Sequence, residues 1–150
     1  LPQDEFVGRI GIDISQSNPN VLYAFYDKQM TEDEENSFYG IYKSENNGQS
    51  WIRTNDYGLE QMNRSFGWYF GQIRIDPVDE NTAYALGVEL AKTENGGDSW
   101  EIIAGYGNAD EIHVDHHTMF FLPEFNKIWI VLHYPRPKFV PNYFFFRGSI

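Results

Sequence analysis

The stretch SENNGQSW at residues 44–51 returns 49 residues later as TENGGDSW at residues 93–100. Both copies place a hydroxyl residue, an asparagine, a glycine, a serine and a tryptophan at the same offsets, and a lysine stands before each copy. A period of roughly 20–50 residues is typical of stacked or radial repeat architectures. The duplicated motif therefore predicts a chain built from repeated units.

The residue types of the motif predict a tight turn between two strands. The hydroxyl and the asparagine amide can bond backbone groups within the turn. The glycine stands where a positive φ is needed, and the tryptophan begins the next strand with one N–H to place. The structural residues of this turn are Ser44, Asn46, Gly48 and Trp51 in the first copy and Thr93, Asn95, Gly97 and Trp100 in the second.

This turn resembles the Asp-box, or BNR repeat, of sialidases, xyloglucanase-like glycoside hydrolases and VPS10/sortilin propellers. The family pattern is Ser/Thr-x-Asp-x-Gly-x-Ser/Thr-Trp, and here Asn46 and Asn95 replace the aspartate, which keeps an acceptor oxygen without the charge. In these families the box holds a turn remote from any active site. The resemblance therefore implies a propeller fold and leaves the activity open.

The repeat extends beyond the turn. GRIGID at residues 8–13 matches GQIRID at 71–76, NVLYA at 20–24 matches NTAYA at 81–85, and a weaker third copy covers 121–130. Alternating apolar positions favour strands, and no window has helical periodicity. Four strands per unit at this period predict an all-β fold made of four-stranded antiparallel β-propeller blades.

We expect blade repeats at about residues 6–57, 66–106 and 112–130, so that residues 1–130 form a partial Asp-box propeller. This gives about 2.5–3 blades, whereas a propeller closes with about 4–8, so the chain is predicted to be a fragment of a larger propeller. Residues 131–150 depart from the repeat, with prolines that block a central strand and a final aromatic run. We interpret this tail as a truncated or frame-shifted reading, with a divergent tail as the alternative.

Composition limits the partners. A net charge of −11 argues against nucleic acid, and no apolar run is long enough to span a membrane as a helix. The chain has no cysteine, no starting methionine and no signal peptide. The resemblance implies that the parent protein is extracellular or periplasmic.

The densest polar cluster is HVDHH at residues 113–117. An extended chain would place His113, Asp115 and His117 on one face and His116 on the other. These three are candidates for proton transfer, and His116 is a candidate for substrate binding. The alternative is structural hydrogen bonding. Because the three side chains would spread over about 13 Å, no metal site and no cofactor are predicted.

The second candidate site is FGWYFGQIR at residues 66–74. Exposed rings such as Trp68 and Tyr69 bind sugars by stacking, and Arg74 could bind a carboxylate bidentately. The alternative is aromatic packing between blades, with Arg74 paired to an acid such as Asp76.

Glycoside hydrolysis needs two carboxylates, about 5–5.5 Å apart for retention or about 6.5–9.5 Å for inversion. Asp13, Asp76 and Asp115 lie near predicted inner strands, and the first two are expected to cap turns. The resemblance implies a glycoside hydrolase-like propeller that acts on or binds polysaccharide. The alternatives are a non-catalytic VPS10/sortilin-like propeller that binds peptide or protein, and a fragment without independent activity.

Overall fold

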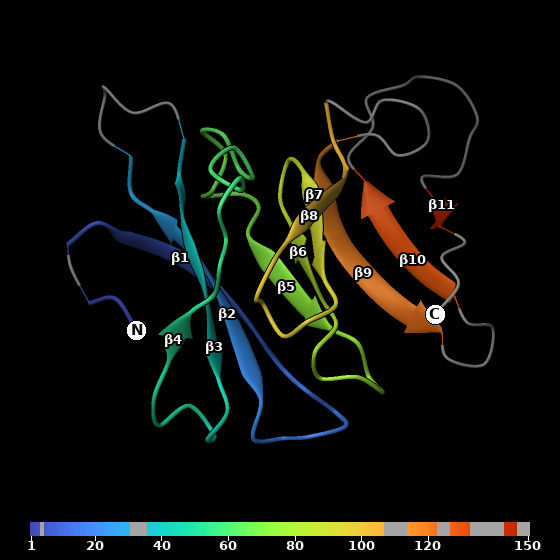
Figure 1. The fold of residues 1–150 in the computed structure, drawn as a ribbon. Coiled ribbons are helices and arrows are strands. Elements are labelled where there is room, and N and C mark those ends of the chain that lie inside the picture. Colours follow the sequence, from blue (N-terminus) through green and yellow to red (C-terminus); the bar gives the residue numbers. More distant parts are fainter. Residues whose placement is uncertain (4, 31–35, 107–113, 123–126, 133–142, 147–150) are drawn as a thin grey trace.

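The chain folds into three antiparallel sheets. The computed structural model describes every residue except 4, 31–35, 107–113, 123–126, 133–142 and 147–150, and the described residues contain no helix (Figure 1). The first sheet consists of β1 (Val7–Ile14), β2 (Leu22–Lys28), β3 (Phe38–Ser44) and β4 (Ile52–Arg53). The second consists of β5 (Gln72–Ile75), β6 (Ala83–Leu86), β7 (Leu90–Thr93) and β8 (Glu101–Ala104). The third consists of β9 (His116–Leu122), β10 (Lys127–Leu132) and β11 (Tyr143–Phe146).

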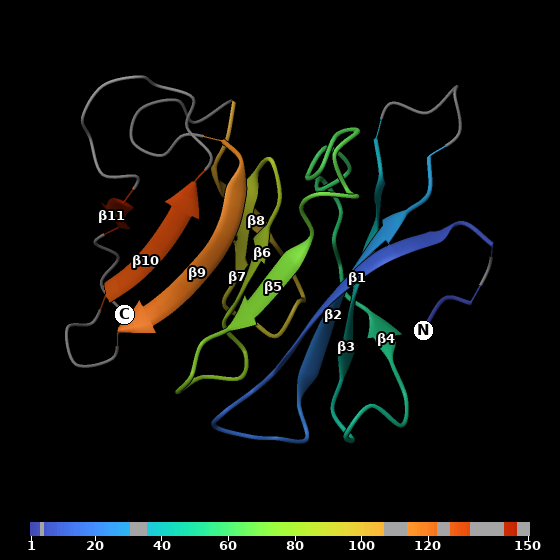
Figure 2. The same ribbon diagram turned by 180° about the vertical axis from the view of Figure 1, so that it is seen from behind.

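The sheets stand side by side through their first strands. Strand β5 contacts β1 on one side and β9 on the other, and Figure 2 shows β5 between them. Within each of the first two sheets the strands follow in chain order. Two four-stranded meanders and a three-stranded sheet therefore stand in a row, as adjacent blades do in a propeller.

An apolar core lies between the first two sheets. Tyr23 and Phe25 of β2 are buried against Ile73 and Ile75 of β5, which are 0% and 4% exposed. Alternation along the strands produces this face, because side chains of a strand point to opposite sides in turn. A second core joins the second and third sheets and contains Tyr84, Leu86, Leu90, Ala104 and Met119.

Both box turns are held by the same hydrogen bonds. In the first, the Ser44 hydroxyl accepts from Gly48 N at 2.9 Å, and Asn46 Oδ1 accepts from Ser50 N at 2.9 Å. In the second, Thr93 Oγ1 accepts from Gly97 N at 3.0 Å, and Asn95 Oδ1 accepts from Ser99 N at 3.0 Å. The positive φ predicted for the two glycines is confirmed, at 79° and 92°.

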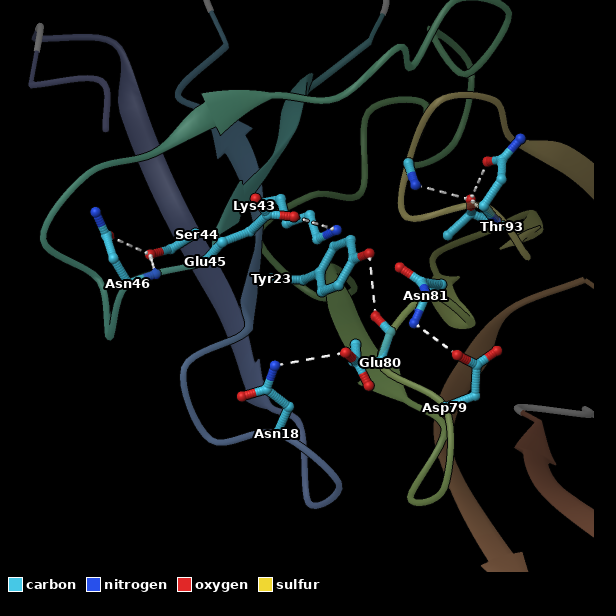
Figure 3. Close-up of polar contacts among 12 residues, drawn as sticks. Asn18, Tyr23, Lys43, Ser44, Glu45, Asn46, Asp79, Glu80, Asn81 and Thr93 are labelled. Atoms are coloured by element: carbon cyan, nitrogen blue, oxygen red, sulfur yellow. Dashed lines mark hydrogen bonds and ion pairs between the residues drawn. The ribbon is translucent and has the colours of Figure 1, made fainter.

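Polar contacts at the box end tie the second sheet to the first. Tyr23 donates its hydroxyl hydrogen to the carbonyl of Glu80, and the amide of Asn18 donates to the Glu80 carboxylate (Figure 3). The Trp100 indole donates to Thr54 Oγ1 at 3.1 Å, which links the second box turn to the residue directly after β4. The box turn is therefore also an inter-sheet contact.

One side of β1, at the edge of the first sheet, is apolar and exposed. Ile10, Ile12 and Ile14 project from one side of β1 and are 45%, 53% and 53% exposed. Ile10 and Ile12 correspond in the repeat to Ile73 and Ile75, which the neighbouring sheet buries. The face of β1 is thus the position that a preceding blade fills in a propeller.

We expect that Asn95→Ala lowers the free energy of unfolding by about 1–2 kcal/mol, because three hydrogen bonds of the second turn lose their partner. Asn95→Asp keeps the acceptor oxygen, and Ser99 can donate its hydroxyl to the new carboxylate, so this variant should stay within about 0.5 kcal/mol of the wild type. Urea unfolding measures both. An alanine variant as stable as the aspartate variant would show that the side chain does not hold the turn.

We also expect that Ile12→Lys reduces concentration-dependent self-association, because contiguous exposed apolar surface promotes it. Ile52→Lys is the matched control, since Ile52 is 74% exposed but belongs to β4, at the other edge of the sheet from β1. Light scattering across a concentration series measures the effect. Equal scattering from the two variants would contradict a special role for the β1 face.

Candidate functional site

The end of the sheets opposite the box turns carries a long folded loop, residues 54–71, which joins β4 to β5 and which we call the platform loop (green, top of Figure 1). Successive turns shape it: Leu59 N donates to Asp56 O, Met62 N to Leu59 O, and Phe66 N to Asn63 O. Leu59 and Met62 are almost fully buried in the core between the first two sheets. These two apolar anchors fix the loop to the sheets.

Two neighbouring rings stand at the surface of this loop. Trp68 is 74% exposed and Tyr69 is 44% exposed, and their ring centroids lie 5.3 Å apart. His117 supports the other side of Tyr69, with edge-to-face rings 5.0 Å apart, and also packs against Phe70. We call Trp68 and Tyr69 the aromatic platform. The structure thus brings together three residues that the sequence placed in two separate candidate sites.

Two arginines lie near the inner strands. Arg9 of β1 donates from Nη1 to the carbonyl of Tyr69 at 2.5 Å, which fixes the backbone under the platform. Arg74 donates to Gln72 Oε1 at 2.8 Å and to the carbonyl of Ile73. Arg74 therefore bonds along its own strand, in place of the alternative pairing with an acid such as Asp76.

The histidine segment does not form one extended face. Strand β9 begins at His116, and Asp115 has φ of 75°, a left-handed conformation that turns the chain. Asp115 N donates to Val88 O, and His116 N donates to Gly87 O. The expectation of aligned side chains is wrong for this reason. His116 is fully buried, and His113 lies outside the described residues.

Beneath the platform loop lies a buried acid that sequence reasoning missed. Asp27, near the end of β2, accepts a hydrogen bond from the Asn63 amide through Oδ1. Burial raises the pKa of Asp27 to about 8, while the Asn63 hydrogen bond and the charge of Arg9 oppose that rise. Two features of the sequence could have indicated this buried acid. Asp27 directly follows the unbroken apolar run of residues 21–26, and Gly67 and Gly71 flank the aromatic residues 68–70.

Asn63 also begins the sequon Asn63-Arg64-Ser65. Its side chain is fully buried and bonded to Asp27, so the folded chain does not present it for glycan attachment. Arg64 pairs with buried Glu89 at 3.5 Å and lies over the ring of Tyr106. This segment of the loop is therefore structural.

The acids of the inner strands are also occupied. Asp76 Oδ1 accepts from Val78 N and Asp79 N, so its predicted role as a turn cap is confirmed. Asp13 accepts from its own neighbour Ile14 N and, through Oδ2, from Ile75 N at 2.8 Å. Asp13 therefore links β1 to β5, which its predicted role as a turn cap did not include.

A polar groove of about 800 Å³ lies at the opposite end, between the two box turns. Its lining combines Lys43 and Arg53 with Glu45 and Asp98, and the box asparagines that reach it are bonded within their own turns. Lys43 pairs with Glu45 at 2.9 Å, and Arg53 pairs with Asp56 at 3.1 Å. Because both cations of the groove are engaged in this way, we place the candidate site at the platform loop.

Comparison with solved structures identifies the class of fold as a β-propeller. A GH74 enzyme from Niastella koreensis matches with a TM-score of 0.59 and 15% identity over 81% of this chain. An ancestral GH74 enzyme matches with a TM-score of 0.56 and 19% identity over 80% of the chain. YCF48 from Cyanidioschyzon merolae matches with a TM-score of 0.50 and 17% identity over 88% of the chain.

These matches cover 19% and 16% of the two GH74 enzymes and 33% of YCF48. No protein-family model matches the chain, and no curated protein matches it. At these identities the similarity defines the fold, and the predicted class is confirmed: an all-β, partial β-propeller that fits as a fragment of a larger one.

Across the residues that the structure describes, no helix is long and apolar enough to cross a membrane. Within the same residues, no group of three or more histidine, cysteine, aspartate or glutamate side chains is placed to hold a metal ion.

We expect that Gly71→Ala destabilises the chain by about 2–4 kcal/mol. The new Cβ would lie 2.3 Å from Asp27 Oδ2, and φ at this position is 94°. Gly58→Ala is the matched control, because φ is 87° there and no atom lies within 4 Å of the added Cβ, so about 1–2 kcal/mol of backbone strain is expected. Urea unfolding measures the difference, and equal losses would show that the contact with Asp27 is not tight.

Proposed function

We propose that this chain is part of a glycoside hydrolase-like propeller that binds polysaccharide through the aromatic platform. The observation that carries the proposal is the pair of exposed rings, Trp68 and Tyr69, on a loop anchored to two sheets. Aromatic faces of this kind offer a large apolar surface at low entropic cost. Support from His117 and Arg9 holds the platform in place before a ligand arrives, which favours affinity.

A hydrolytic reaction would belong to the intact propeller. Asp13 and Asp76 are engaged by backbone N–H groups, so a catalytic carboxylate pair would draw on other acids. Asp115 and His117 are our candidates for proton transfer in this chain, because Asp115 directly precedes β9 and His117, within β9, packs against Tyr69 of the platform. Arg74 is a candidate for binding an acidic group, and its guanidinium is held by Gln72.

We propose the same blade limits as the sequence indicates, residues 6–57, 66–106 and 112–130, and an extracellular or periplasmic location for the parent protein. The strands β1–β4 and β5–β8 fall within the first two ranges. The rival function is that of a propeller that binds peptide or protein, which would use the same exposed rings as an apolar anchor.

The test is binding of the chain to a panel of xyloglucan, cellulose oligosaccharides, sialylated glycans and unrelated peptides, measured by calorimetry. We expect binding to at least one polysaccharide, and Trp68→Ala should weaken it about 30-fold, since truncation of an aromatic anchor costs about 2 kcal/mol or more. Tyr57→Ala is the control, because Tyr57 is 86% exposed on the same loop. Binding of peptides alone would favour the rival function, and binding of no polysaccharide would overturn the proposal.

A further inference from the structure

We propose that Asp27 is a positioning residue that holds the platform loop in place through its uncharged carboxyl group, and that the loop loosens as rising pH favours the ionised form. This inference rests on the proposed function only in so far as the platform is taken to bind polysaccharide. The docking of the loop can be measured without any ligand.

The loop is built closely around this carboxyl group. Asp27 is 1% exposed, and a Cβ on Gly71 would lie 2.3 Å from its Oδ2. A Cβ on Gly67 would lie 2.7 Å from its Oδ1. Glycine at both positions lets the backbone approach the acid from two sides. Trp68 and Tyr69 lie between these two glycines in the sequence, so the position of the aromatic platform depends on the contact of both glycines with Asp27.

Further hydrogen bonds connect the same part of the loop to the first sheet. Gly67 N donates to the Ser37 hydroxyl at 2.8 Å, and Ser37 N donates to the carbonyl of Arg64 at 2.6 Å. Arg9 donates to the carbonyl of Tyr69. The residues that face Asp27 from the loop and from the start of β3 are Asn63, Gly67 and Ser37, all without charge. Arg9 of β1 is the charged group that acts on it.

The surroundings of Asp27 disfavour an ionised carboxylate. Asn63 donates to Oδ1, whereas Oδ2 has no hydrogen-bond donor among the residues that the structure describes. An ionised carboxylate that leaves water for one amide donor loses far more solvation than it regains. The pKa of Asp27, raised to about 8 by burial, is consistent with this environment.

The direction of the pH effect follows from linkage. The pKa of Asp27 is higher in the docked state than the ordinary value near 3.9 of an exposed aspartate. The stabilisation of the docked loop by Asp27 is therefore complete below about pH 4. It decreases as the pH rises towards 8, and above that pH it does not change further. Loop opening that exposes Asp27 should thus become about tenfold more frequent for each pH unit between about 5 and 8.

Hydrogen exchange of the amides of Gly67 and Tyr69, corrected for the intrinsic pH dependence of exchange, tests the proposal. In the wild type we expect their protection to fall about tenfold per pH unit from pH 5 to 8 and then to level off. Their protection should stay below that of the β6 amides, so that opening of the loop is separate from unfolding of the sheets. Asp27→Asn should remove the slope and keep the protection, because the amide is uncharged and of similar shape.

Glu89→Gln is the matched control, because Glu89 is a second buried acid at this end of the molecule, paired with Arg64. It should leave the slope unchanged. A slope that persists in Asp27→Asn, a slope removed by Glu89→Gln, or equal protection of loop and β6 amides would overturn the proposal. Failure of the polysaccharide assay leaves these outcomes unaffected, so the two proposals fail separately.

Discussion

The arrangement of the sheets depends on how closely the strands β1 and β5 approach. A Cβ on Gly11 would lie 2.2 Å from the carbonyl oxygen of Gly71, so the two backbones meet directly where Gly11 has no side chain. Asp13 adds a hydrogen bond from Ile75 N to the same contact. This spacing sets the depth at which Tyr23 and Phe25 pack between the sheets. The same close approach fixes the position of Gly71, the last residue of the platform loop. The position of Gly71 in turn fixes the aromatic platform beside it.

The two box turns differ in the hydrogen-bond partner of their tryptophan, and the difference shows the effect of a neighbouring sheet. The hydrogen bonds inside the turns are the same, but Trp51 donates to the carbonyl of Gly48 in its own turn, whereas Trp100 donates to Thr54, the residue that follows the first sheet. The isoleucines of β1 and β5 differ in the same way, exposed in the first sheet and buried in the second. Local chemistry therefore makes the turn, and a tertiary contact decides the partner of its tryptophan.

This division explains what the sequence could predict. The box turns were predictable because their hydrogen bonds join residues at most four apart, as in the bond from Ser50 N to Asn46. The strands and the blade class were predictable because the sequence repeats and its apolar residues alternate. The exposed rings of the site were predicted as well, whereas the buried pair beneath them was not, because Asp27 and Asn63 are 36 residues apart and nothing local links them. The prediction of one extended face for residues 113–117 was wrong because Asp115 has a left-handed backbone conformation, with φ of 75°. In the tail, Tyr143–Phe146 pairs with β10. The sequence did not predict this strand, because the prolines before it argued against one.

The two ends of the molecule are held by interactions of different kinds. Uncharged amides and hydroxyls close the box turns, so their geometry does not depend on the titration of a side chain. At the platform end, Arg9 serves two partners: its guanidinium is bonded to the Tyr69 carbonyl, and its charge favours the ionised form of Asp27. The guanidinium that holds the Tyr69 carbonyl is therefore also the group whose charge favours ionised Asp27, so one side chain connects the aromatic platform to the acid beneath it.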